Sequence, residues 1–287
     1  MAKAASQLNI SQPAVSKAIA ELEHMLGVRL VDRSRQGVEP TESGRALLQG
    51  GVAMFDDLRQ AVKNIEFLTD PAAGEVRIGC NLFLAASFVS AVVDRLSRRY
   101  PRVVFHVVPS PTATLHRDLH ERNVDLLITR SLGPIADERL GYEFLFEDKY
   151  VIAAGAQSPW VRRRRIELAE LAGESWTLPP PENLMWLVVM EAFRAVGLDY
   201  PRTTVVTGSP HVRMNLLTTG RFLTIFSDSA LIFPTKRPEF KILPVELSKT
   251  RVQNGIVTLK NRTLGPVARL FIEAARELAK PLGKARP

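Results

Sequence analysis

The segment from Ser11 to Leu30 constrains this chain more than any other stretch, because its pattern predicts a helix with two unlike faces. Apolar residues recur at the spacing of one helical stripe, namely Val15, Ala18, Ile19, Leu22, Met25 and Leu26. The opposite face holds short, neutral or basic residues, namely Gln12, Pro13, Ser16, Lys17 and Ala20. A helix that only had to stay soluble would usually place Glu and Lys pairs there. This face can instead approach a flat, polar partner such as DNA.

Residues on both sides of this helix predict where it begins and ends, and they predict a second helix before it. Residues 2–8 are compatible with a helix, and Asn9 tolerates the left-handed conformation of a tight turn. Ser11 is a good N-cap, Pro13 falls in the first turn, where a missing N–H costs nothing, and Gly27 favours a stop. The result is a helix-turn-helix, whose second helix enters the DNA major groove with its N-terminal residues on base edges.

A two-stranded wing is predicted directly after this helix. Residues 28–31 have the pattern of a short strand, residues 33–37 that of a turn, and Val38 begins the return strand. Arg33 and Arg35 fall near the tip, where they could meet phosphates or the minor groove. The alternative is a hairpin with exposed arginines and no ligand, but the neighbouring helix-turn-helix favours DNA contact.

Thr41 is a predicted N-cap, and the segment that it opens predicts one long helix with a heptad seam. Its positions step by three and four residues through Gly44, Leu47, Gly51, Met54, Leu58, Ala61, Ile65 and Leu68. The alternative is an amphipathic helix that packs on its own domain. The regular steps from Gly51 onward favour self-pairing, and a dimeric helix-turn-helix protein reads two half-sites on one face of the duplex.

The rest of the chain alternates strand and helix patterns after a hinge-like linker at residues 71–75. This alternation indicates a mostly parallel sheet in two α/β lobes, which would bind a small molecule between them at the carboxyl ends of strands. The net charge of +8 says little about the N-terminal segment, because residues 1–70 hold 8 basic and 9 acidic side chains. The arginine run at residues 162–165 fits a solvated loop.

Residues 4–44 resemble the winged helix-turn-helix of LysR-type bacterial transcriptional regulators. The matching motifs are Ser-Gln-Pro-Ala-Val-Ser at 11–16, Leu-Glu before Leu-Gly within 22–27, Val-Arg-Leu at 28–30, an Arg in the wing, and Thr-Glu-Ser-Gly at 41–44. The resemblance continues to the C-terminus. One departure is that family members normally begin with another helix of about sixteen residues, so this chain would start inside the next helix. The apolar stripe would then lose part of its cover, at a cost of several kcal/mol at about 25 cal/mol per Å².

The resemblance implies an α/β fold class with three parts. An incomplete winged helix-turn-helix, all-α plus a wing, would span 1–40, and a linker and dimerisation helix would span 41–70. A two-lobed, periplasmic-binding-protein-like effector domain would span 71–287, with lobe I at 75–148 plus 253–287 and lobe II at 149–252. Implied partners are double-stranded DNA with an interrupted palindromic operator, a small organic effector, further copies of the chain as dimer or tetramer, and RNA polymerase. Expected DNA-contacting residues are Ser11, Gln12, Pro13, Ser16, Lys17, Arg33 and Arg35.

Turns at the ends of the predicted strands supply the candidate effector site. Helix N-termini there expose N–H groups that suit an anion or a hydroxyl-rich ligand. The candidates are Asn81, Leu82, Phe83, Thr112, Arg130, Met185, Ser209 and Phe226. Thr112 and Arg130 resemble effector-contacting Thr and Arg residues of the family. Arg130 could pair with a carboxylate of the effector, or it could form a salt bridge that ties the lobes together.

Nothing in the sequence indicates catalysis, a cofactor or a metal. His116 and His120 share the i, i+4 spacing of metal ligands but lack a third ligand, so a surface pair is favoured. Cys80 is the single cysteine, which excludes an internal disulfide and fits a cytoplasmic protein without membrane contact. The main alternative to a regulator is a ligand-binding sensor without competent DNA binding, because of the short N-terminus. A solute-binding relative lacks its export signal, and an enzyme ranks third.

Overall fold

The computed structural model of the chain describes all residues except 35–36, 132–136, 182, 233–238, 249 and 284–287. Its contacts divide the chain into two compact units, Met1–Ala61 and Val62–Pro287. The division falls inside a single long helix, α3 (Glu42–Thr69). Each unit is described by itself below. No helix among the described residues is long and apolar enough to cross a membrane.

The first unit opens with the helix-turn-helix that the sequence predicts. Helix α1 (Ala2–Leu8) ends at Asn9, which adopts the left-handed conformation, and α2 (Gln12–Leu26) follows after a tight turn. The Ser11 hydroxyl caps α2 by accepting a hydrogen bond from the Ala14 N–H at 3.3 Å. Gly27, with φ of 69°, ends the helix. The predicted helix-turn-helix, the left-handed Asn9, the Ser11 cap and the stop at Gly27 are therefore confirmed.

A two-stranded wing joins α2 to α3. Strands β1 (Val31–Ser34) and β2 (Gly37–Pro40) pair antiparallel. The Glu23 carboxylate fastens the wing to α2, because it accepts hydrogen bonds from the Leu30 N–H at 2.7 Å and the Val31 N–H at 3.1 Å. Thr41 then caps α3 as predicted, since its hydroxyl accepts from the Gly44 N–H at 3.0 Å and donates to the Arg29 carbonyl at 2.7 Å.

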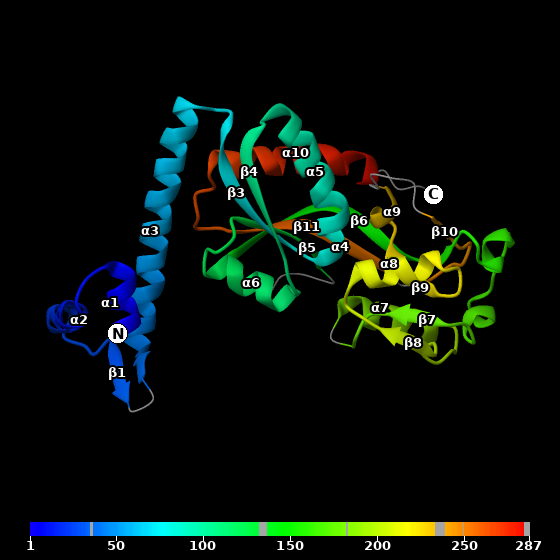
Figure 1. Cartoon of the computed structure of the whole chain (residues 1–287), viewed down its shortest axis with the longest axis horizontal. Helices are drawn as coiled ribbons and strands as arrows, with labels where there is room; N and C mark the ends of the chain where they lie inside the picture. The colour runs from blue at the N-terminus through cyan, green and yellow to red at the C-terminus, as the bar shows by residue number, and fades with distance from the viewer. Residues whose placement is uncertain (35–36, 132–136, 182, 233–238, 249, 284–287) are drawn as a thin grey trace. The chain divides into compact units, whose positions relative to one another are not determined.

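The described residues of the second unit form one nine-stranded sheet with helices around it (Figure 1). Its strands are β3 (Ala73–Cys80), β4 (Arg102–Pro109), β5 (Leu126–Ser131), β6 (Leu140–Gly155), β7 (Trp176–Leu178), β8 (Thr203–Val206), β9 (Leu223–Ser227), β10 (Phe240–Ile242) and β11 (Arg251–Leu259). Its α-helices are α4 (Leu82–Leu84), α5 (Ser90–Arg99), α6 (Thr112–His120), α7 (Leu184–Arg194), α8 (Pro210–Thr218), α9 (Ser229–Ile232) and α10 (Pro266–Gly283). Short 3-10 turns cover Pro159–Arg162 and Leu168–Leu171.

The sheet is mixed, whereas the sequence predicted a mostly parallel one. Its order is β4-β3-β5-β11-β6-β9-β7-β8, with β10 beside β6. Strands pair parallel at the two ends, but β11 runs antiparallel to both β5 and β6, and β6 runs antiparallel to β9. The prediction was wrong here because local alternation of strand and helix does not reveal how two long strands cross the middle of a sheet.

Two large hydrophobic cores lie along this sheet. The first core packs β3 and β5 against α5 and α10, with Phe88 and Phe271 fully buried. Figure 1 shows α5 and α10 on one face of these strands and α6 on the other, where α6 has a small core of its own. The second core packs β6, β7 and β9 against α7 and α8, around Trp176 and Phe193.

Phe83 connects the two cores. Phe83 lies in α4, directly after strand β3 of the first core, but its ring packs into the second core against Phe226. A π-helical turn, Ala85–Val89, follows α4 and leads into α5. The alternation of strands and helices in the sequence predicted a helix after this strand but not the π-helical turn, which is a form that occurs often at functional sites.

Candidate functional site

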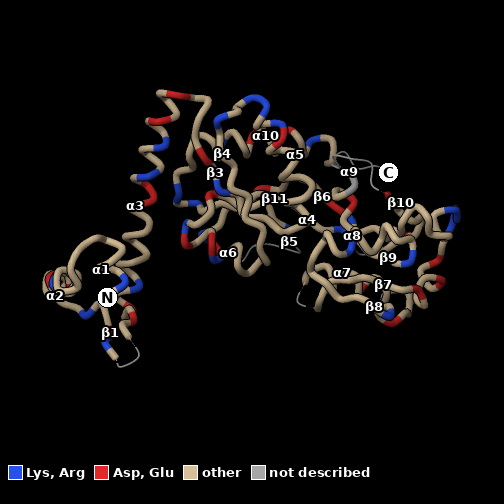
Figure 2. Tube along the Cα trace, viewed as in Figure 1, with Lys and Arg blue, Asp and Glu red and all other residues tan. Residues whose placement is uncertain are grey.

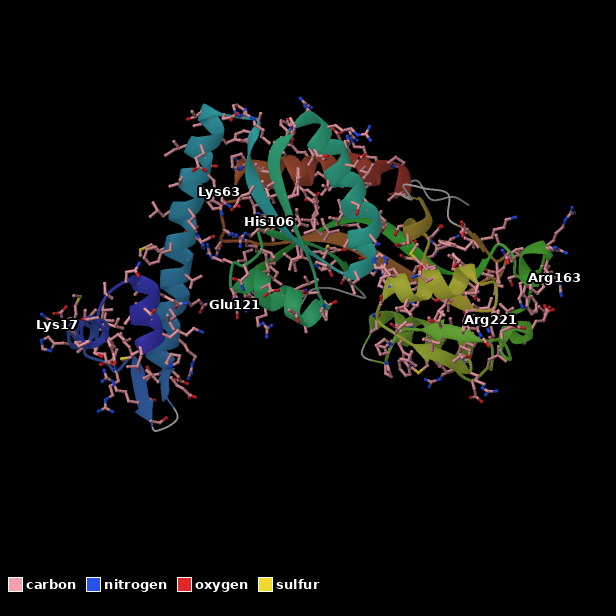
Figure 3. All side chains as sticks on the ribbon, in the orientation of Figure 1. Lys17, Lys63, His106, Glu121, Arg163 and Arg221 are labelled. Atoms are coloured by element: carbon pink, nitrogen blue, oxygen red, sulfur yellow. The ribbon has the colours of Figure 1, made fainter. Side chains whose placement is uncertain are left out.

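The polar face of α2 is open to solvent along most of its length. Gln12 and Pro13 are exposed, and the Lys17 side chain is 78% exposed with a long ion-pair contact to Glu21 at 3.8 Å. Figure 3 shows Lys17 pointing outward from α2. Side chains that are exposed at the N-terminal end of a helix can reach base edges in a groove.

Two of the predicted contact residues on α2 have structural partners. The hydroxyl of Ser11 accepts the capping hydrogen bond of the helix. Ser16 is half-buried, and its hydroxyl donates to the Met1 sulfur at 3.2 Å. Neither bond uses all of the hydroxyl's capacity, because a hydroxyl donates one hydrogen bond and accepts two. Both residues therefore keep polar atoms that could meet DNA.

The wing presents one of its two predicted arginines within the described residues. Arg33 is exposed on β1 opposite Val38 of β2, and Arg35 lies outside the described residues. The pKa of Glu23 is lowered by the Leu30 and Val31 N–H groups, and further by the charges of Arg33 and Arg29. This carboxylate therefore stays ionised at neutral pH and holds the wing on α2.

Charge of both signs is mixed over the first unit. Figure 2 shows basic and acidic residues interspersed along its elements, in keeping with the even balance of the sequence. A general cationic surface is therefore not what distinguishes this unit. Its distinguishing feature is the open, hydrogen-bonding face of α2.

The apolar flank of α2 and the first half of α3 border a hollow of about 690 Å³. The sequence predicted that the apolar stripe of α2 has lost part of its cover, and no α2 residue is fully buried, with Leu22 and Met25 exposed. The α3 seam is open too, apart from Gly44, which packs under Leu30, and Gly51, which is half-buried. Its exposed members are Leu47, Met54, Leu58, Ala61, Ile65 and Leu68. This apolar row is available for self-association.

In the second unit, the predicted effector residues divide into two groups. Asn81 and Ser209 act as helix caps, because Asn81 accepts from the N–H groups of Phe83 and Leu84, and Ser209 from Val212. Leu82 and Thr112 are exposed at the starts of α4 and α6. The other four come together around one buried region, namely Phe83, Arg130, Met185 and Phe226.

Arg130 of β5 lies at the centre of this region, and its side chain reaches residues of β6 and β9. Its guanidinium donates to the Tyr150 hydroxyl at 3.1 Å and to the Ser227 hydroxyl at 2.7 Å. Its distance to the Asp148 carboxylate is 3.9 Å, and it lies over the rings of Phe83 and Tyr150. The contact to Asp148 is a long ion pair, and the pairing of Arg130 with an effector carboxylate stays a prediction.

Sequence reasoning missed Arg213, a fully buried arginine of α8 beside the same region. Its guanidinium lies 4.5 Å from the centre of the Phe83 ring and 5.5 Å from that of Phe226. Burial lowers its pKa to about 10. One sign of its burial lies in the residue spacing of the sequence. Arg213 lies three residues after Pro210 and four before Leu217, on the helix face that these two buried residues share.

The histidine and cysteine candidates take no part in this region. His120 lies 3.0 Å from the Asp137 carboxylate, and the pKa of His116 is lowered by burial and by the neighbouring His120. Within the described residues, no three potential ligands gather for a metal ion. Cys80 is buried, and burial raises its pKa to about 12, so its thiol stays protonated.

Comparisons with known proteins agree in both units. Residues 1–45 match the bacterial regulatory helix-turn-helix protein description of the lysR family, and residues 69–280 match the LysR substrate binding domain. The regulator GbpR of Azospirillum brasilense is 26% identical over 96% of this chain and 80% of its own length. Full-length OxyR C199D of Pseudomonas aeruginosa superposes with a TM-score of 0.70 at 20% identity, covering 99% of this chain and 93% of its own.

The fold also matches full-length CbnR in complex with its target DNA, with a TM-score of 0.58, 18% identity, and coverage of 97% of this chain and 93% of that one. The helix-turn-helix match over residues 1–45 does not favour the alternative of a sensor without DNA binding. Family members are transcriptional regulators and not enzymes. The chain belongs to the LysR family of DNA-binding bacterial transcriptional regulators, with an effector-binding domain in its second unit.

Proposed function

We propose that α2 reads operator DNA in the major groove through Ser11, Gln12, Pro13, Ser16 and Lys17, while Arg33 and Arg35 hold the wing to the phosphate backbone. The open polar face of α2, within a segment that matches the family's DNA-binding domain, is the observation that carries this proposal. Small side chains let the helix approach the base edges, and the arginines add contacts that fix its position.

The apolar row of α3 supports self-association. Five large apolar side chains of this row are exposed at heptad spacing, which is costly in water unless a second helix covers them. We propose a dimer through α3, with dimers pairing into tetramers as the resemblance implies. A dimer places two reading helices on half-sites one or more helical turns apart, which requires an interrupted palindrome.

The buried region around Arg130 supports effector binding in the second unit. It lies where Phe83, which directly follows strand β3 of the first core, packs against Phe226 in the second core, so a ligand there would touch elements that belong to both cores. We propose that a small organic effector binds in this region, shifts the balance between two arrangements of the domain, and so alters DNA bending and contact with RNA polymerase in the cytoplasm. Such a shift requires the ligand to prefer one arrangement.

Selection of bound genomic fragments, followed by footprinting with the full chain, tests this function. We expect one family of fragments with two protected half-sites, whose centres are separated by a multiple of about 10.5 base pairs. The protected sequence should be palindromic, because a twofold dimer presents the same face twice. Uniform protection without sequence preference would contradict operator recognition.

A further inference from the structure

Arg213 is a cation in an apolar place. It lies on the buried stripe of α8 with 0% exposure, and its guanidinium is flanked by the rings of Phe83 and Phe226. Its Nη1 donates to the Ile225 carbonyl at 3.3 Å and lies 4.0 Å from the Met185 sulfur. Ring faces attract a cation, but they accept its hydrogen bonds poorly.

The remaining donors of Arg213 are unsatisfied. Its Nε and Nη2 atoms are buried and have no hydrogen-bond partner among the described residues. No ion pair joins Arg213 to a carboxylate in that part of the chain either. Buried polar groups are nearly always hydrogen-bonded and buried charges paired, because the unpaired group loses its hydration without replacement. The side chain is therefore suited to a partner with negatively charged oxygen atoms.

A second buried arginine makes the excess of positive charge larger. The Arg130 side chain is 8% exposed, and its charge lowers the pKa of Arg213, so the two guanidinium groups act on one region. The nearby carboxylate, Asp148, is largely engaged, since it accepts from the N–H of Ser229 at 3.0 Å and from its hydroxyl at 2.5 Å. Among the described residues, the two arginines and the carboxylate of Asp148 therefore leave one excess positive charge in this region.

Further donors and apolar surface complete the region. The Tyr200 hydroxyl is buried, has no partner among the described residues, and lies near enough to Arg213 for the charge to affect its pKa. Phe83 and Phe226 lie 6.0 Å apart in an edge-to-face pair and supply apolar contact. This combination suits an oxyanion group attached to a hydrocarbon body.

We propose that the effector is a small monocarboxylate, bound through its carboxylate by Arg213 together with Arg130, with its hydrocarbon part against Phe83 and Phe226. This inference rests on the proposed effector site and names its ligand class. The single excess positive charge that the described residues leave here favours a monoanion over a phosphate dianion. The planar guanidinium fork matches the two oxygens of a carboxylate.

Access to Arg213 involves Phe83. Because the guanidinium is fully buried under this ring, a ligand reaches it when Phe83 turns aside. Phe83 belongs to a three-residue helix that continues into the π-helical turn, on the side of the first core. Binding of the carboxylate therefore changes the contact between the two cores, which connects ligand occupancy to the arrangement of the domain.

Thermal unfolding of the full chain at constant ionic strength tests this proposal with benzoate, its neutral isostere benzamide, and phenyl phosphate. We expect benzoate to raise the melting temperature by about 3 to 5 °C at ten times its dissociation constant, and benzamide to have no effect. Arg213→Met should weaken benzoate binding at least tenfold. Arg221→Met, a matched variant at an exposed arginine after α8 (Figure 3), should respond as wild type does.

The ligand-free protein gives an independent readout. Because Arg213→Met removes an unpaired buried charge and keeps a side chain of similar length, its melting temperature should equal or exceed that of wild type. Should this variant fail to fold, Arg213→Lys keeps the charge and loses the fork, and it should bind benzoate at least tenfold more weakly.

Three results would overturn the proposal. The first is an unchanged melting temperature of wild type with benzoate, and the second is a response to phenyl phosphate alone. The third concerns Glu182, an acidic residue outside the described part, three positions before Met185. If Glu182→Gln and Arg213→Met each destabilise the ligand-free protein, and the double variant no further, the two residues form a structural pair.

DNA binding distinguishes this inference from the proposed function. Operator binding by the full chain without benzoate, together with absent carboxylate binding, contradicts the ligand class alone. Carboxylate binding that leaves the footprint on the operator unchanged contradicts the regulatory coupling and leaves the Arg213 site standing.

Discussion

At the scale of single residues, Lys17 and Arg33 test the DNA-contacting face. Both are exposed, and the contact of Lys17 to Glu21 at 3.8 Å is too long and too solvated to add much stability. We expect Lys17→Ala and Arg33→Ala each to weaken operator binding by about 1–3 kcal/mol, a factor of roughly 5 to 150. Gel-shift titration at fixed salt with the selected operator measures this loss.

The salt dependence of binding and a variant at a distant arginine serve as controls for Lys17→Ala and Arg33→Ala. If a residue contacts phosphate, its removal should lower the slope of log affinity against log salt by about one. Arg163→Ala, at an exposed arginine of the second unit (Figure 3), should change neither affinity nor slope. Equal affinity of wild type, Lys17→Ala and Arg33→Ala would leave the proposed interface without support.

The role of a residue could be predicted from the sequence where it depends on neighbours in the chain, but not where it depends on tertiary packing. Ser11 and Thr41 cap their helices because a hydroxyl before a helix accepts nearby N–H groups, which depends on neighbours in the chain alone. Phe83 and Arg130 were expected at strand ends and lie together. Arg213 was missed, because an arginine on a helix is usually solvated, and its burial depends on rings contributed by distant segments.

At the scale of elements, two glycines of α3 make a matched pair. A Cβ atom on Gly44 would lie 2.0 Å from the Leu30 carbonyl oxygen, whereas a Cβ on Gly50 would meet nothing within 4 Å. Gly44→Ala should therefore destabilise the first unit by about 1–3 kcal/mol. Gly50→Ala should stabilise it by about 0.5–1 kcal/mol, because glycine is a poor helix former. Denaturant unfolding followed by circular dichroism measures both, and equal effects would refute the close approach.

The exposed row of α3 predicts a variant that separates self-association from folding. Leu58 is 62% exposed on this row, so Leu58→Glu should leave the fold intact and place a charge in the seam of the dimer. We expect at least a tenfold increase in the dimer dissociation constant by analytical ultracentrifugation. Gln49→Glu adds the same charge on another face of the helix and should have no effect. Similar behaviour of the two variants would argue against the row as the interface.

Element types followed from the sequence, but their arrangement in the sheet did not. Heptad and cap signals located α2 and α3, and apolar runs bounded by turn residues located the strands. Strand direction in the middle of the sheet depends on where β11 returns, over a hundred residues after β5. The π-helical turn Ala85–Val89 likewise depends on packing of α4 between two cores, and local periodicity gives no warning of it.

At the scale of the whole molecule, the net positive charge lies in one part of the chain, and the proposed recognition of the DNA sequence lies in another. Residues 1–61 contain seven basic and seven acidic side chains, so the entire net charge of +8 belongs to residues 62–287. Charge of this kind attracts any nucleic acid without reading its sequence. Recognition is proposed for α2, which lies in the neutral unit. The two contributions can therefore be separated by experiment.

A fragment of residues 62–287 makes this separation. It contains both large cores and the last turns of α3, and we expect it to unfold cooperatively on heating. Its affinity for the operator should equal its affinity for an unrelated duplex and fall steeply with salt, since only phosphate attraction remains. The full chain should prefer the operator by a factor of about 10³ or more. A fragment that still prefers the operator would show that residues outside the helix-turn-helix read the sequence, and the role given to α2 would be wrong.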